Sequence, residues 1–145
     1  MDEAWRLLHL LAAAFWLGGL IVLGMLAVVS HRVLDAESFQ TLMVSAGRAF
    51  LGASAIAWIV IAASGVALAA GRIQGVGQLQ STGWGRTLEA KTGLAFLAVV
   101  LAAVHSVAGR KTSSAGWVVA SRGLSALVLL VTVGVFYLAV RLTEG

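Results

Sequence analysis

Four long apolar runs, separated by polar connections, dominate the chain. They cover about Trp5–Val29, Phe50–Ala70, Leu88–Ala108 and Trp117–Val140. Each holds about 20 residues or more, which at 1.5 Å per residue is enough to cross roughly 30 Å of hydrocarbon. Because a backbone in lipid must satisfy its own hydrogen bonds, runs of this kind are predicted to be helices. The pattern predicts an all-α integral membrane protein, with a four-transmembrane-helix bundle forming a single domain over residues 1–145.

The first connection carries a helical pattern of its own. Phe39, Leu42, Met43 and Ala46 recur at i, i+3, i+4 and i+7, the spacing of one helix face. Asp35 stands where an N-cap residue would. We therefore expect a short interfacial helix after the first transmembrane helix, running into the second.

The other two connections differ in length and composition. The segment from Arg72 to Arg86 is rich in Gly, Gln, Ser and Thr, which is typical of a flexible polar loop. The last connection, between Ala108 and Trp117, is short. A short connection makes the third and fourth transmembrane helices antiparallel neighbours.

Composition supports a membrane location and narrows the partners. Hydrophobic residues make up 60% of the chain and charged residues only 11%, whereas a soluble domain has about 25% charged residues. The net charge of +4 comes from cations scattered over the connections, a distribution that suits lipid headgroups. We expect the lipid bilayer as a partner and no nucleic acid. The absence of cysteine excludes disulfides and thiolate chemistry.

Cations give only a weak signal for orientation, because each side of the predicted bundle carries five. The side reached after the first and third helices holds Arg32, Arg48, Arg110, Lys111 and Arg122. The adjacent Arg110 and Lys111 in a short loop favour this side as cytoplasmic under the positive-inside rule. Both termini are then predicted to lie outside.

Three histidines are candidate ligands. His9 lies about one turn inside the first helix, and neutral imidazole suits both a metal ion and heme iron. The alternative is an interfacial histidine that is hydrogen-bonded near the headgroups. His105, near the end of the third helix, and His31, just after the first, are expected at the opposite end from His9. They form a second candidate metal site, or else they are simply solvated.

A charged cluster, Arg86, Glu89 and Lys91, opens the third helix. Charged groups inside a membrane are costly, so they call for a function. Arg86 and Lys91 suit an anionic ligand such as heme propionates, or a proton relay. The alternative is a set of snorkelling side chains with an internal ion pair. Glu89 is expected close enough to the helix N-terminus to be stabilised by the helix dipole.

Small residues predict where helices approach closely. Gly18-Gly19 in the first helix and Ser64-Gly65 in the second suit close helix packing, as do Ser125 and Thr132 in the fourth. Lone methionines such as Met25 and Met43 are usually packing residues, although thioethers also bind Cu(I).

The charged cluster belongs to a longer motif. The sequence Ser64-Gly65-Val66, a polar loop and then Gly83-Trp84-Gly85-Arg86-Thr87-Leu88-Glu89-Ala90-Lys91 resembles the copper resistance protein D (CopD-type) membrane domain. His9 followed by Trp16-Leu17-Gly18-Gly19 also looks like the first helix of that family. The resemblance covers most of the chain and implies copper handling across a bacterial-type inner membrane.

A second, weaker resemblance overlaps the first. His9, Trp16, Gly19 and Leu20 are similar to the first helix of the HemJ-type membrane protoporphyrinogen oxidase, and His31 falls near a histidine that closes that helix. Lys91 and His105 loosely match a lysine and a histidine in that family's third helix. This resemblance implies binding of heme b.

Three hypotheses follow for the function. The leading one is a CopD-type protein for copper transport or resistance, with His9, His31 and His105 as metal ligands. The second is a heme b-binding redox protein, with His9 as axial ligand and Arg86 or Lys91 near the propionates. The third is a small non-catalytic subunit of a larger membrane complex, or a homodimer. A non-enzymatic role is favoured, and an enzymatic one implies a heme-dependent membrane oxidoreductase.

Overall fold

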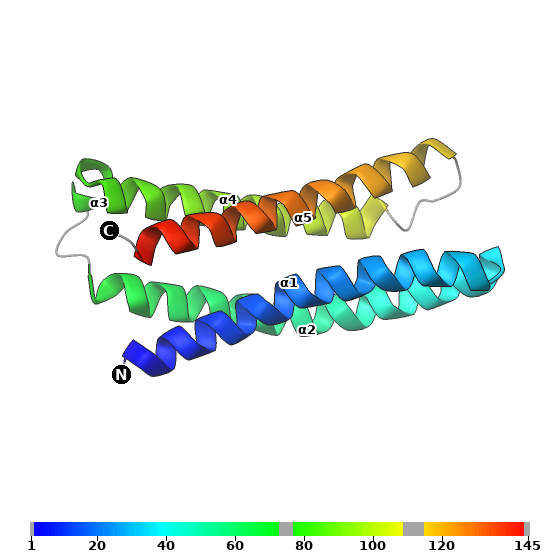
Figure 1. Cartoon of the computed structure of the whole chain (residues 1–145), viewed down its shortest axis with the longest axis horizontal. Coiled ribbons are helices and arrows are strands. Elements are labelled where there is room, and N and C mark those ends of the chain that lie inside the picture. The colour runs from blue at the N-terminus through cyan, green and yellow to red at the C-terminus, as the bar shows by residue number, and fades with distance from the viewer. Residues whose placement is uncertain (1, 73–76, 109–114, 144–145) are drawn as a thin grey trace. The chain divides into compact units, whose positions relative to one another are not determined.

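The computed structural model describes residues 2–72, 77–108 and 115–143, and the described chain is almost entirely helical (Figure 1). Its helices are α1 (Asp2–Val33), α2 (Ala36–Ala70), α3 (Gly77–Ser81), α4 (Gly83–Ala108) and α5 (Ala115–Thr143). Four of them, all but α3, are long and apolar enough to cross a membrane. The prediction of an all-α protein with four membrane-length helices is confirmed. The chain divides into two compact units, Met1–Arg72 and Ile73–Gly145.

In the first unit, α1 and α2 form an antiparallel hairpin with only Leu34 and Asp35 between them (Figure 1). The Leu34 amide donates to the Ser30 carbonyl at 2.9 Å, which closes the last turn of α1. Asp35 is the N-cap of α2, as predicted, and its carboxylate accepts from the Ser38 amide at 2.8 Å. The expected short helix is not a separate element: its residues form the first turns of a continuous α2, because no residue in Ala36–Ala70 breaks the helix, and their interfacial location stays a prediction.

The cap also sets the charge state of Asp35. The hydrogen bond from the Ser38 amide, supported by the Ser38 hydroxyl at 3.1 Å, lowers the pKa of the Asp35 carboxyl below its usual value of 3.8. Hydrogen bonds to a carboxylate favour the ionised form. The cap is therefore charged at neutral pH.

The second unit corrects the prediction of a flexible loop between Arg72 and Arg86. Residues Gly77–Ser81 form the short helix α3, and α4 begins at Gly83. Thr82 explains the early start, because its hydroxyl oxygen accepts from the Gly85 amide at 3.0 Å and its carbonyl accepts from the Arg86 amide at 3.1 Å. Residues 73–76 lie outside the described part of the chain.

The early start of α4 changes the setting of Glu89. No acidic residue lies in the first turn of α4, and Glu89 is the seventh residue of the helix. The field of a helix N-terminus falls off within the first turn. The expected dipole stabilisation of Glu89 is therefore wrong.

The helices α4 and α5 pack side by side, which confirms that they are antiparallel neighbours (Figure 1). Their shared face buries Ala98 and Val128, together with Thr132, whose hydroxyl donates to the Val128 carbonyl at 2.8 Å. A Cβ added at Gly134 would lie 3.6 Å from Leu94 Cδ1. Small side chains thus let these two helices approach closely, as expected for packing in lipid.

Candidate functional site

The imidazole of His9 lies against α2, which makes it the best-held candidate ligand in the described chain. Its Nδ1 is 3.1 Å from the Ile61 carbonyl oxygen and 2.9 Å from the Ser64 hydroxyl oxygen. Ser64 is fully buried, and a Cβ added at Gly65 would lie 3.5 Å from His9 Cε1. The ring is therefore fixed against the small-residue face of α2 that Ser64 and Gly65 provide.

The partners of Nδ1 assign the tautomer of His9. The Ile61 carbonyl only accepts hydrogen bonds, so Nδ1 must carry the hydrogen that it donates there. The single hydroxyl hydrogen of Ser64 has its own acceptor, the Val60 carbonyl at 2.5 Å. Nδ1–H is thus the donor, and Nε2 carries the lone pair that would coordinate a metal. A metal-binding histidine commonly has this arrangement, with its second ring nitrogen donating to a carbonyl or another acceptor.

An aromatic cluster lies near His9 on the seam, meaning the packed interface between α1 and α2. Trp16, seven residues after His9, stacks on Phe50 with ring centroids 5.6 Å apart and meets Trp58 edge-on at 5.2 Å. Phe15 lies 6.1 Å from Phe50. Only 5% of Trp16 is exposed. The spacing of seven residues between His9 and Trp16 places both on one helix face.

The two glycines of the Gly18-Gly19 pair have different roles. A Cβ added at Gly19 would overlap the ring of Phe50, whereas nothing lies within 4 Å of a Cβ at Gly18. The predicted close approach is therefore made at Gly19, where the absence of a side chain makes room for the aromatic cluster.

His31 is well separated from His9 in the first unit. It is exposed and meets the ring of Phe39 edge-on, with centroids 5.5 Å apart. His9 and His31 are 22 positions apart on one continuous helix, which corresponds to a rise of about 33 Å. These two histidines cannot ligate the same ion.

His105 lies in the second unit, where its Nε2 is 3.3 Å from the Ser125 hydroxyl of α5. It is half-buried and is separated from Lys91 by about 21 Å of helix rise. The contact bridges α4 and α5 near the end of α4. Since His31 belongs to the first unit, a joint His31–His105 site stays a prediction.

In the charged cluster of α4, Arg86 and Glu89 lie three residues apart on one side of the helix and Lys91 lies on another. Arg86 and Glu89 are exposed and Lys91 is half-buried. None of the three forms an ion pair within the described residues. The internal ion pair that would make these residues purely structural is therefore not present in the described chain.

No group of three or more His, Cys, Asp or Glu side chains is arranged to hold a metal ion within the described ranges. His9, His31 and His105 each meet different neighbours.

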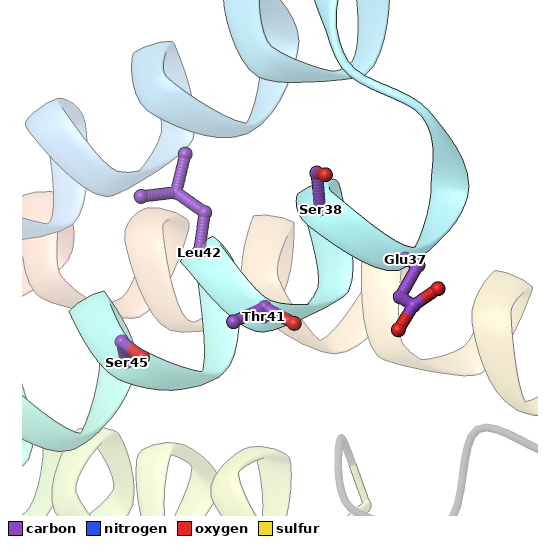
Figure 2. A pocket seen from close by; sticks show the side chains of 5 residues that line it. All are labelled: Glu37, Ser38, Thr41, Leu42 and Ser45. Carbon is purple, nitrogen blue, oxygen red and sulfur yellow. The ribbon is translucent and has the colours of Figure 1, made fainter.

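A shallow hollow on the outer face of α2 is lined by Glu37, Ser38, Thr41, Leu42 and Ser45 (Figure 2). All five come from the first turns of one helix, and Glu37 points away from the other four side chains (Figure 2). Carboxylate and hydroxyl oxygens line this hollow, but all of its lining residues come from α2, so no second helix encloses it. It marks a polar face of α2 rather than a built binding site.

Comparison with known protein families, with curated proteins and with solved structures finds no match for this chain.

Proposed function

We propose that this chain is a heme b-binding membrane redox protein in which Nε2 of His9 would hold the heme iron. The observation that carries the proposal is the fixed imidazole, with Nδ1–H held by the Ile61 carbonyl and the Ser64 hydroxyl. These partners orient the ring and increase the electron density at Nε2, the atom that would bind iron.

The spacing of the nitrogen donors favours heme over a bare copper ion. Within the first unit, His9 and His31 are about 33 Å apart along α1, and within the second, Lys91 and His105 are about 21 Å apart along α4. A copper ion needs several protein ligands at one point. Heme iron already has four porphyrin nitrogens, so one well-placed histidine meets most of the need for a protein ligand.

The residues present fit the other parts of a heme as well. The aromatic cluster around Trp16 lies seven residues further along α1 from His9, and aromatic side chains suit a porphyrin face. Arg86 and Lys91 are cations without an ion-pair partner among the described residues, and cations suit propionates.

When bound, the heme would supply reversible one-electron chemistry. The protein's part is to hold His9 in one rotamer and one tautomer. Ser64 has a double task, since its hydroxyl oxygen accepts from His9 while its hydrogen is directed to its own helix. Ser64 therefore keeps the hydrogen on Nδ1, because its hydroxyl acts there as an acceptor and not as a donor.

The test is an absorbance spectrum of the full-length protein, purified in mild detergent after expression with heme supply. A Soret band is expected in the wild type. The Soret absorbance per protein chain of His9→Ala is expected to be at least ten-fold lower. His31→Ala is the matched control, because His31 is exposed on the same helix, and it should keep the wild-type spectrum. A colourless wild type overturns the proposal, as does an unchanged spectrum in His9→Ala.

Ser64→Ala sharpens the assignment. It should keep the heme but measurably raise its reduction potential or lower its affinity, because Nδ1–H loses one of its acceptors and the electron density at Nε2 falls. The readouts are a redox titration and a heme-transfer assay to apomyoglobin. Identical values for Ser64→Ala and wild type would remove Ser64 from the site.

Copper handling is the second candidate, favoured by the Gly85-Arg86-Thr87-Leu88-Glu89-Ala90-Lys91 motif and its CopD-type resemblance. Metal analysis by mass spectrometry on the same samples separates the two. A colourless protein that contains copper in proportion to chain, and loses it in His9→Ala, would replace the heme proposal with copper.

The four apolar helices indicate a multi-pass membrane protein in contact with lipid. An inner-membrane location with both termini outside, and assembly as a homodimer or as a subunit of a larger complex, remain part of the proposal. Co-purification with one stable partner in mild detergent would support the subunit role.

A further inference from the structure

The face of α2 that packs on α1 follows a strict heptad spacing. The residues on it are Phe50, Ser54, Ala57, Ile61 and Ser64, separated by four, three, four and three positions. Phe50 contacts Trp16 and the last two contact His9. Ser54 lies between these anchor points, so its side chain faces α1 beside Trp16. Only 2% of Ser54 is exposed.

The hydroxyl of Ser54 differs from several other hydroxyls of the long helices. These donate to a carbonyl three or four residues earlier in the same helix, as seen for Ser64, Thr87, Thr92, Ser106 and Thr132. The buried hydroxyl of Ser54 has no hydrogen-bond partner in the described chain. Its oxygen is directed elsewhere than to its own helix.

One turn later, a second polar atom has the same property. The indole Nε1 of Trp58 is buried and has no hydrogen-bond partner among the described residues. The ring of Trp58 meets Trp16 edge-on at 5.2 Å, so this N–H belongs to the aromatic cluster, about one helical turn from Ser54. Residues four apart on a helix lie one above the other on one face.

Two unsatisfied buried groups in one place are costly. Each costs about 1–3 kcal/mol if nothing bonds to it, and lipid offers no alternative partner. Buried polar atoms of this kind are commonly satisfied by an ordered water. Indole N–H only donates, and a hydroxyl both donates and accepts, so a single water oxygen satisfies both groups at once.

We propose that the α1–α2 seam contains a binding site for one ordered water molecule, which accepts from Trp58 Nε1–H and bonds to the Ser54 hydroxyl. The water bridges two side chains of α2 that lie four residues apart, and it lies beside Trp16 of α1. The site is independent of any heme or copper bound at His9.

The experiment is nuclear magnetic resonance of the full chain with ¹⁵N-labelled indoles in detergent micelles. The sequence has five tryptophans, and Trp58→Phe assigns the Trp58 indole signal as the one that disappears. A cross-peak between the Trp58 indole hydrogen and water is expected in a rotating-frame Overhauser experiment. Its sign should be that of a dipolar contact, which is opposite to the sign that hydrogen exchange produces. A wild-type spectrum without this dipolar cross-peak overturns the proposal.

Matched variants test whether Ser54 takes part. Ser54→Ala should lose the Trp58–water cross-peak, while Ser45→Ala, on the exposed polar face of the same helix, should keep it. A cross-peak that survives in Ser54→Ala overturns the bridge. Should Ser54→Ala not fold, the wild-type spectrum together with Ser54→Thr, which retains the hydroxyl and should retain the cross-peak, still decides the question.

Discussion

The seam between α1 and α2 holds an imidazole, two indoles and buried hydroxyls, whereas the seam between α4 and α5 holds mostly small and aliphatic side chains. In the first, His9 makes two contacts of 3.1 Å or less to α2. In the second, the contact between His105 and Ser125 is 3.3 Å, and packing centres on Ala98 and Val128. Helices in lipid gain little from the hydrophobic effect, so they associate by close packing and by hydrogen bonds. The two hairpins rely on these in different proportions.

The sharpest way to break this contrast is to remove the aromatic centre of the first hairpin. Trp16→Ala should lower the free energy of unfolding by about 3 kcal/mol, because it deletes a buried ring that contacts Phe50 and Trp58. Unfolding is measured by titration with sodium dodecyl sulfate in mixed micelles. The control Phe96→Ala removes a ring that is 70% exposed and should have little effect; equal losses would contradict the contrast.

The second hairpin should be most sensitive to added volume. Ala98, which is 1% exposed in the face that meets α5, leaves no room for a larger side chain. Ala98→Leu should therefore destabilise by about 2 kcal/mol through overpacking, measured as above. Ala126→Leu, at an exposed position of α5, should be close to neutral. A tolerant Ala98 would show that α4 and α5 are not tightly packed there.

A smaller effect separates two neighbouring glycines. Gly19→Ala should cost about 1.5 kcal/mol, because the new methyl group displaces the ring of Phe50. Gly18→Ala meets no atom within 4 Å and should stabilise slightly through helix propensity. The difference between the two variants in the same unfolding assay is the quantity to measure, and its reversal would contradict the packing of Phe50 on Gly19.

The smallest expected effect is at the turn of the first hairpin. The pKa of Asp35 is lowered by the Ser38 amide in the folded state, so its stabilising effect is complete above the unfolded pKa. That effect is lost as pH falls through the lower, folded pKa. Amide hydrogen exchange at Ser38, corrected for intrinsic rates, should show reduced protection in acid. Asp35→Asn, which keeps a capping oxygen, should remove this pH dependence, and an unaltered pH profile would argue against the cap.

Much of the fold is legible in the sequence because the apolar runs are long and the cap chemistry is local. Asp35 was predictable as an N-cap, as it stands directly before a helical pattern. Thr82 carried the same type of signal, but the Gly- and Ser-rich composition around it suggested a loop. That composition obscured both α3 and the early start of α4.

The site was only half predictable. His9 stands out as a polar residue in an apolar run, but its partners lie 52 and 55 residues away. Pairing them requires the register of the hairpin, and the register depends on the turn being just two residues long. The apolar runs alone suggest a connection of about twenty residues between Val29 and Phe50, and a connection of that length does not fix the register of the two helices. Likewise, sequence does not distinguish Gly18 from Gly19, because only the rotation of α1 decides which of them faces Phe50.

The two-residue turn has a consequence for how the first hairpin meets the bilayer. The apolar run of α1 continues to Val29, about five residues from the turn, whereas α2 keeps its polar face from Glu37 to Ser45 and becomes continuously apolar only near Phe50. The two hydrophobic boundaries are thus offset by about ten residues, or roughly 15 Å of rise. An upright hairpin cannot place both at one depth. Tilting brings them closer, with the polar face of α2 turned towards the headgroups, so the angle of this hairpin should vary with bilayer thickness.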